Sequence, residues 1–126
     1  MVYKPLLRGL LPATCVLCGG AARGSLDLCA DCAADLPALA DACPRCAMPL
    51  PAGPGAACGR CLQRLPRFGA CVAALRYEYP VRELLSRFKF QGELAAGRML
   101  AGLLAERLDA LPAGRRGGML LAPVPL

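Results

Sequence analysis

The chain contains no histidine and no tryptophan, and its aromatic residues are limited to three tyrosines and three phenylalanines. Without histidine a Cys–His nucleophile is impossible. Every ligand of a metal site built from the cysteine pairs would therefore be a sulfur atom. Few aromatic residues leave only a thin core, and small domains with thin cores usually need a covalent or metal clamp. The nine cysteines of this 126-residue chain are the candidates for that clamp.

Long apolar runs are also lacking. No run approaches the roughly 18 residues that a membrane span requires, so we expect no membrane span. Near the start, Lys4 and Arg8 interrupt the apolar residues, and Pro5 and Pro12 bracket them, which argues against a signal peptide. We therefore expect a cytoplasmic protein, in which thiols stay reduced and clustered cysteines act as metal ligands.

Eight of the nine cysteines form four Cys-x-x-Cys pairs, separated by ten, ten and eleven residues. Cys15-Val-Leu-Cys-Gly recurs as Cys43-Pro-Arg-Cys-Ala, and Cys29-Ala-Asp-Cys recurs as Cys58-Gly-Arg-Cys, which indicates two copies of one module. Zinc favours four tetrahedral ligands, and each pair supplies two thiolates from one tight turn. The sequence thus predicts two zinc ions, with these ligands: Cys15, Cys18, Cys29, Cys32, Cys43, Cys46, Cys58 and Cys61.

Other uses of these cysteines fit less well. A disulfide framework needs an oxidising compartment, and thioredoxin-like chemistry uses one Cys-x-x-Cys at the head of a helix. Iron–sulfur clusters usually show three cysteines in tighter spacing. Iron in a rubredoxin-like site uses the same four thiolates and stays an alternative to zinc. Four thiolates leave no coordination position for water, so both sites are predicted to be structural.

The spacing leaves two ligand pairings open. Sequential pairing joins the first two Cys-x-x-Cys pairs in one site and the last two in the other, whereas a cross-braced arrangement interleaves them. The internal repeat favours sequential pairing. The ninth cysteine, Cys71, lies in a predicted strand, and we expect it to be a free, buried, small apolar residue.

The formal charge of +6 overstates the basic character of the chain. Each four-thiolate zinc site carries −2, so two sites lower the charge to about +2. The bases concentrate in residues 60–98, and Phe68, Tyr77 and Tyr79 are possible stacking surfaces for single-stranded nucleic acid. Candidate contacts are Arg60, Arg64, Arg67, Arg82, Arg87 and Lys89. The alternative interpretation is an ordinary solvated face, with Phe88 and the tyrosines in the core.

The pattern changes near residue 70. Residues 70–79 predict a strand, and Val81, Leu84, Leu85 and Phe88 predict an amphipathic helix that stops at Gly92. A second helix is expected over 93–108, with Leu100, Leu103, Leu104 and Leu108, and a buried strand over 119–126. We predict a β-turn-rich double zinc ribbon over 1–68 and an incomplete α/β segment over 69–126, and we interpret the chain as truncated.

The order of these features resembles the ComF family, the competence protein F and amidophosphoribosyltransferase-like proteins. The residues that carry the resemblance include Leu28-Cys-Ala-Asp-Cys, Cys43-Pro-Arg-Cys-Ala-Met-Pro-Leu, Tyr77-Glu-Tyr-Pro-Val-Arg-Glu-Leu-Leu, Phe88-Lys-Phe-Gln-Gly and Pro123-Val-Pro-Leu. The resemblance implies a double zinc ribbon followed by the start of a type I phosphoribosyltransferase domain. It also implies a part in competence, with single-stranded DNA or a competence protein as partner.

The sequence departs from that family after Pro123-Val-Pro-Leu, because the basic segment and the Arg-Gly-Phe-Asn-Gln stretch that follow in the family are missing. The acidic Asp-Asp loop with Thr and Gly that holds phosphoribosyl pyrophosphate is missing, and Gly114-Arg-Arg-Gly-Gly neither follows a strand nor opens a helix. We therefore expect no binding of phosphoribosyl pyrophosphate and no catalysis by this chain. One hypothesis is a structural zinc-binding module with a nucleic-acid role. The alternative is a phosphoribosyltransferase whose catalytic half lies beyond residue 126, and a third is a ribbon that recruits another protein.

Overall fold

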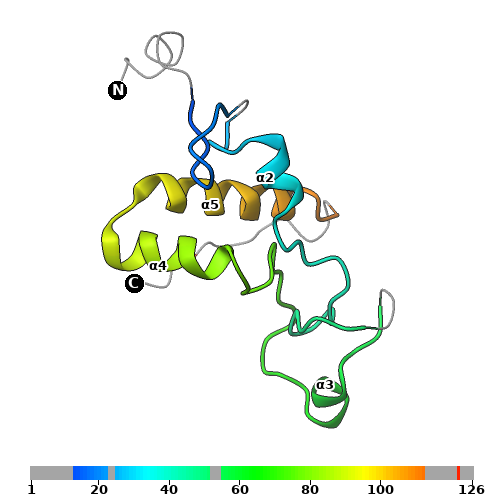
Figure 1. Ribbon diagram of the computed structural model, residues 1–126. Coiled ribbons are helices and arrows are strands. Elements are labelled where there is room, and N and C mark those ends of the chain that lie inside the picture. The colour runs from blue at the N-terminus through cyan, green and yellow to red at the C-terminus, as the bar shows by residue number, and fades with distance from the viewer. Residues whose placement is uncertain (1–12, 23–24, 52–54, 113–121, 123–126) are drawn as a thin grey trace.

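The computed structural model describes residues 13–22, 25–51, 55–112 and 122. Within these ranges the ordered elements are helices α2 (Ala30–Ala34), α3 (Gly59–Gln63), α4 (Val81–Gln91) and α5 (Leu94–Asp109) (Figure 1). The described residues pair as strands only at three isolated antiparallel bridges, which join Thr14 to Ala21, Ala38 to Leu75 and Ala42 to Pro49. None of the helices in the described ranges combines the length and apolar character needed to cross a membrane.

Helices α4 and α5 form a hairpin, as Figure 1 shows. The predicted stripe on α4 is confirmed: Val81 and Leu84 are buried, and Leu85 and Phe88 pack against the same core. Gly92 ends α4 in the left-handed conformation, with φ of 69°, which a residue without Cβ adopts most readily. The two helices therefore begin and end close to where the sequence places them.

The predicted stripe on α5 is confirmed in part: Leu100 and Leu103 pack against the core, but the fully buried residues of the helix are others. Ala96 and Met99 are its buried residues, while Leu104 is 41% exposed. Gly97 and Gly102 lie in the helix interior, where a Cβ on Gly97 would overlap the Phe88 ring and one on Gly102 would overlap Leu26. The glycines let α5 approach both α4 and the N-terminal segment closely.

The larger core joins the first two cysteine pairs to the helical hairpin. Its buried members come from both halves of the chain and are Cys15, Leu28, Leu36, Val81, Leu84, Ala96 and Met99. An exposed ion pair between Arg98 of α5 and Asp27, with 3.8 Å between nitrogen and oxygen, lies at the same junction. The first ribbon and the hairpin therefore share one core that spans segments 1–68 and 69–126.

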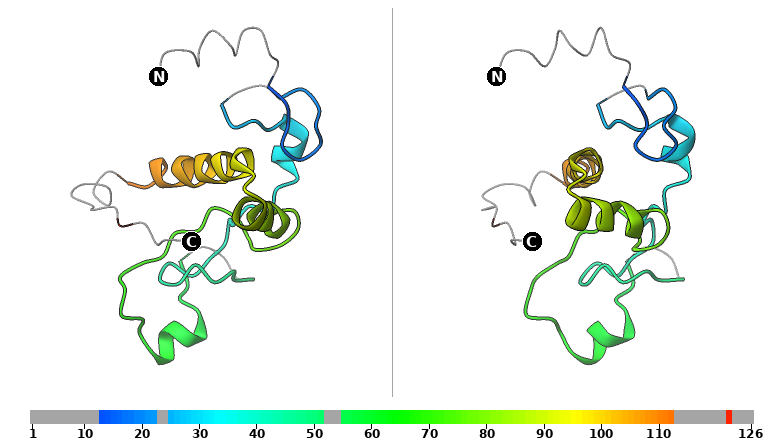
Figure 2. Two further views of the ribbon diagram at one scale, coloured as in Figure 1. Left: turned by 90° about the vertical axis from the view of Figure 1, so that its left-hand side faces the viewer. Right: turned by 60° about the vertical axis from the view of Figure 1, so that its left-hand side comes forward.

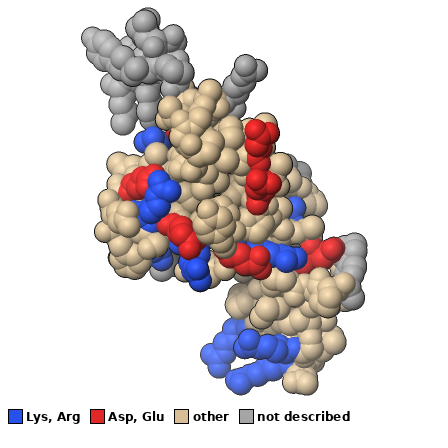
Figure 3. Space-filling view, in the orientation of Figure 1, with Lys and Arg blue, Asp and Glu red and all other residues tan. Residues whose placement is uncertain are grey.

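The second pair of cysteine turns lies apart from this core. Its own cluster consists of buried Cys43, Cys58 and Cys61, with Cys46, Leu50 and Ala57 packed against them. In Figure 2 this part of the chain, which carries α3, extends away from the α4–α5 hairpin. We call residues 41–51 and 55–68 the second lobe. On the face shown in Figure 3, basic side chains gather over its far end.

The predicted strand over 70–79 is wrong. Leu75 alone forms a bridge, to Ala38, flanked by hydrogen bonds from Leu39 N–H to the Ala74 carbonyl and from Arg76 N–H to the Pro37 carbonyl. On the side of α2 the pairing does not extend further, because Pro37 has no N–H and the chain before it is the end of that helix.

Two other expectations have different outcomes. Cys71, expected to be buried, is exposed, because the segment around it is not part of a sheet. The strand expected over 119–126 lies outside the described residues, apart from Ala122. The described part of the C-terminal half is helical, and nothing in it shows a phosphoribosyltransferase-like α/β fold.

Candidate metal centres

The first cysteine turn is held by a short hairpin. The bridge between Thr14 and Ala21 closes it, and Cys15 N–H donates to the Gly20 carbonyl at 2.7 Å. Gly19 N–H donates to the Cys15 carbonyl at 2.8 Å, and Gly19 adopts a φ of 72°. This left-handed residue reverses the chain so that the sulfurs of Cys15 and Cys18 face the same point.

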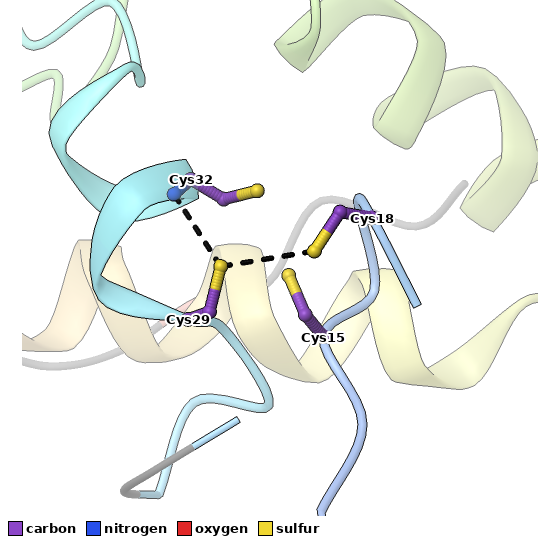
Figure 4. Close-up of side chains that lie close together, drawn as sticks. All are labelled: Cys15, Cys18, Cys29 and Cys32. Atoms are coloured by element: carbon purple, nitrogen blue, oxygen red, sulfur yellow. Dashed lines mark hydrogen bonds between the residues drawn. The ribbon is translucent and has the colours of Figure 1, made fainter. Parts of the chain in front are cut away.

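The second turn of the first site is the start of a helix. Cys29 is the N-cap residue of α2, and the N–H of Cys32 donates to its Sγ at 3.5 Å. Figure 4 shows the four side chains converging, with Cys29 and Cys32 from α2 facing Cys15 and Cys18 from the hairpin turn. Two unlike local structures thus contribute two thiols each to one site.

The second site repeats the hairpin and the helix start of the first, although Cys58 lacks the side-chain cap hydrogen bond that Cys29 makes. Residues 28 positions later form the same hairpin: Ala42 bridges Pro49, and Cys43 N–H donates to the Met48 carbonyl at 2.9 Å. Ala47 replaces Gly19 at the left-handed position, with φ of 58°. Cys58 is the N-cap residue of α3 as Cys29 is of α2, so the internal repeat seen in the sequence is a repeat of structure.

The sulfur atoms have the spacing of a zinc tetrahedron. In each site the four Sγ atoms lie within 4.8 Å of one another. The Sγ atoms of Cys18 and Cys29 are 3.7 Å apart, and those of Cys46 and Cys58 are 3.6 Å apart. A tetrahedron with Zn–S bonds of about 2.3 Å has sulfurs about 3.8 Å apart. The chemistry and the spacing of both ligand sets therefore fit two zinc ions.

Backbone N–H groups point at several of these sulfurs. Gly20 N–H donates to Cys18 Sγ and Cys58 N–H donates to Cys43 Sγ, each at 3.4 Å. Such hydrogen bonds stabilise the thiolate form that binds a metal. They are the second set of interactions expected around a four-thiolate zinc site, and they come from the backbone alone.

The first and last cysteines of each site differ in acidity. Burial raises the pKa of Cys15, but surrounding backbone N–H groups outweigh it and bring the pKa to about 6. For Cys43 the hydrogen bond from the Cys58 backbone is the main reason that its pKa falls to about 6. The neighbouring Cys29 thiol raises the pKa of Cys32, and burial raises the pKa of Cys61 to about 12. Each site thus holds a ready thiolate beside thiols that need the metal to ionise.

The clusters contain the eight predicted ligands, grouped sequentially rather than cross-braced. Cys71 belongs to neither cluster. With four sulfurs around each point, neither site keeps an open position for water, which makes both sites structural rather than catalytic. Among the described residues, no other group of cysteine, aspartate or glutamate side chains has metal-binding spacing.

The six predicted nucleic-acid contacts fall into two groups. Arg60, Arg64 and Arg67 line one hollow of about 510 Å³ beside the second metal site. The others lie on α4: Arg82 pairs with Glu83, and Arg87 makes two hydrogen bonds to Glu93, of 2.5 and 2.6 Å. Lys89 lines a separate hollow with Arg82 and the exposed rings of Tyr77 and Phe90.

Sequence reasoning missed two features of these surroundings. The Arg87–Glu93 pair crosses the α4–α5 turn, and no helical spacing signals a contact between residues six apart. The left-handed Ala47 was also missed, although aligning the two repeats would have placed it opposite Gly19.

Comparison with known proteins bears on the first half of the chain. No curated protein and no solved structure matches the chain. Residues 6–64 match the family model of the double zinc ribbon domain. With two four-cysteine sites of zinc-like geometry in that region, the N-terminal half of the chain is a zinc-binding double zinc ribbon, and a helical part follows it.

Proposed function

We propose that this protein is a zinc-stabilised binding module that holds single-stranded nucleic acid on its second lobe. The observation that supports it is the hollow beside the second metal site, which Arg60, Arg64 and Arg67 line together with Phe68. Among the residues that the structure describes, no acidic side chain lines this hollow. Three guanidinium groups at one concave surface suit the phosphates of a flexible strand.

The apolar residues of the hollow suit the bases. Phe68 is 52% exposed, and Leu65 and Met48 are also exposed beside it. An exposed ring next to bound phosphates is the usual arrangement for unpaired bases, because every base can stack on an aromatic face whatever its sequence. The proposal is therefore for single strands with little sequence preference.

A second role of the arginines is to offset the negative charge of the metal centre, and this role must be separated from nucleic-acid binding. Cys46 and Cys61 line the same hollow, so the −2 charge of a zinc–thiolate centre lies against the arginines. The three arginines carry a charge of +3, one unit more than is needed to neutralise the centre. Arg45, between two ligands of the same site, is also exposed. The test has to follow zinc content alongside binding.

The α4 group is a weaker candidate for this function. Arg82 and Arg87 already have carboxylate partners, so a phosphate would have to displace Glu83 or Glu93. Lys89 is exposed and has Tyr77 and Phe90 nearby, which makes it at most a secondary contact. We place the main contact at the α3 group.

The experiment is fluorescence anisotropy of a labelled 20-nucleotide deoxythymidine strand with the zinc-loaded chain, over a range of salt concentrations. Changing Arg60, Arg64 and Arg67 together to Gln should weaken binding at least about tenfold at low salt. It should also lower the slope of log K against log salt by about 2, at about 0.7 per phosphate contact. Zinc content should stay at the wild-type value.

The matched control changes three exposed helix arginines, Arg82, Arg98 and Arg107, to Gln and alters the net charge equally. It should leave the salt slope within about 0.5 of wild type. Equal loss of binding in both variants would show that only net charge matters. Absence of binding by the wild-type chain at low salt would remove the proposal.

The wider setting stays a prediction. The family model that matches residues 6–64 describes the double zinc ribbon alone, so membership of the ComF family, a part in competence and a phosphoribosyltransferase segment over 69–126 are proposals that rest on the resemblance. Reading the coding DNA past codon 126 tests the enzymatic alternative, because an in-frame Asp-Asp loop with Thr and Gly would support it.

A further inference from the structure

The two metal sites differ in what surrounds them. Cys15 of the first site is buried in the core that includes Leu84 and Met99 of the helical hairpin. The cluster around the second site contains four of its own ligands and only Leu50 and Ala57 besides. The two clusters share no residue. Metal binding is thus one of many interactions that stabilise the core around the first site, whereas the metal ligands make up most of the core around the second site.

Helix α3 depends on the second site more than on its own sequence. It has five residues, far below the length at which a helix is stable in water by itself. Its only buried residue is the ligand Cys61, its N-cap is the ligand Cys58, and Leu62 is 73% exposed. Helix α3 is therefore anchored through two metal ligands, Cys58 and Cys61.

The arginine hollow is built on this helix. Arg60 lies on α3, Arg64 is its C-cap residue, and Arg67 and Phe68 follow directly. Cys46 and Cys61 form part of the wall. Any change that releases the ligands therefore separates the hollow's residues.

We propose that zinc at the second site switches the arginine hollow on and off, while the first ribbon and the α4–α5 hairpin stay folded in either state. The part of this inference that concerns ligand binding rests on the proposed function. The part that concerns local folding does not, because it follows from the two separate cores. The second lobe then acts as a zinc-dependent binding surface carried on a zinc-ribbon and helix platform.

The test uses the 126-residue chain with either half of the second site removed, by Cys43→Ser with Cys46→Ser or by Cys58→Ser with Cys61→Ser. Cys71→Ser, an exposed thiol outside both clusters, is the control for loss of a cysteine. Each chain is purified reduced with zinc, its metal content is measured, and hydrogen–deuterium exchange is followed by mass spectrometry. Two independent variants of one site guard against an effect of any single substitution.

Both double variants should hold one zinc per chain. Protection of residues 59–63 should fall at least about tenfold, while residues 81–109 stay within about twofold of wild type. Binding of the deoxythymidine strand should fall with the protection of residues 59–63, and Cys71→Ser should match wild type throughout. Loss of protection in residues 81–109, or retained protection in 59–63, would overturn the inference. Failure of the wild-type chain to bind the strand would overturn only the proposed function, since exchange is read without ligand.

Discussion

Gly97 and Gly102 lie inside α5, where glycine lowers helix stability by roughly 1 kcal/mol relative to alanine. The structure supplies the reason for them, since the Phe88 ring and the Leu26 side chain occupy the space a Cβ would take. At the metal sites the same residue serves another purpose, because Gly19 adopts a left-handed turn. The lack of a side chain at these glycines thus allows both the close packing of α5 and the left-handed path of the first cysteine turn.

Gly97→Ala tests the helix contact. The added methyl group has to displace the Phe88 ring from the core, and overpacking of this kind typically costs about 1–3 kcal/mol. The free energy of unfolding, measured by urea denaturation of the zinc-loaded chain, should fall accordingly. Gly59→Ala in α3, where a Cβ meets nothing within 4 Å, is the matched helical control and should not be destabilising. An unchanged or higher stability of Gly97→Ala would contradict the packing described.

At the scale of elements, the α4–α5 hairpin and the first ribbon stabilise each other. Leu84, with an exposure of 0%, belongs to the core that also contains Cys15 and Leu28. Helix α2 has five residues and none of them is buried, so the buried residues of the first ribbon pack in a core that the hairpin helps to form. The ribbon's metal site and the hairpin are therefore expected to respond together to a change in either.

Leu84→Ala measures this coupling. Truncating a fully buried leucine typically costs 2–5 kcal/mol, and here part of that loss should appear as faster zinc release from the first site. Exchange protection around Cys15 and Cys18 should drop, with residues 59–63 unaffected. Leu62→Ala removes the same atoms from an exposed position and should change neither. A loss confined to α4 and α5 would show that the ribbon holds its fold unaided.

At the scale of the whole molecule, the two metal ions differ in how much they contribute to the stability of the region around them. Within the described residues, one apolar cluster has an ordinary composition and a second one consists mainly of cysteine. Structural zinc contributes apparent free energies of about 10–16 kcal/mol in small zinc-binding peptides, far more than two apolar side chains. The second lobe is therefore a part of the protein that metal makes possible.

Metal content is the direct measurement. The purified, reduced chain should contain two zinc ions by elemental analysis, and a strong chelator should abolish the exchange protection of residues 59–63. Because every ligand is a thiolate, protons compete with the metal, so zinc affinity should fall as the pH is lowered. Finding stoichiometric iron would identify a rubredoxin-like centre, and finding no metal in a folded chain would refute the zinc ribbon altogether.

The sequence by itself determined the metal chemistry and the local elements. Cys-x-x-Cys spacing, the internal repeat and the lack of histidine name the ligands, because two thiols in one turn are a local property. The stripe on α4 and the stop at Gly92 are local as well, and both were predicted. The repeat also favoured sequential pairing, although spacing alone allowed both arrangements.

Only the tertiary structure decided which parts of the chain share a core. The strand expected near Leu75 is a single bridge to Ala38, a contact between residues far apart in sequence, and Pro37 has no N–H to continue it on one side. Cys71 is exposed for the same reason, and Arg87 is drawn to Glu93 by the turn between two helices. Short-range spacing determines which atoms can bind a metal, whereas burial depends on long-range packing, and no local pattern records it.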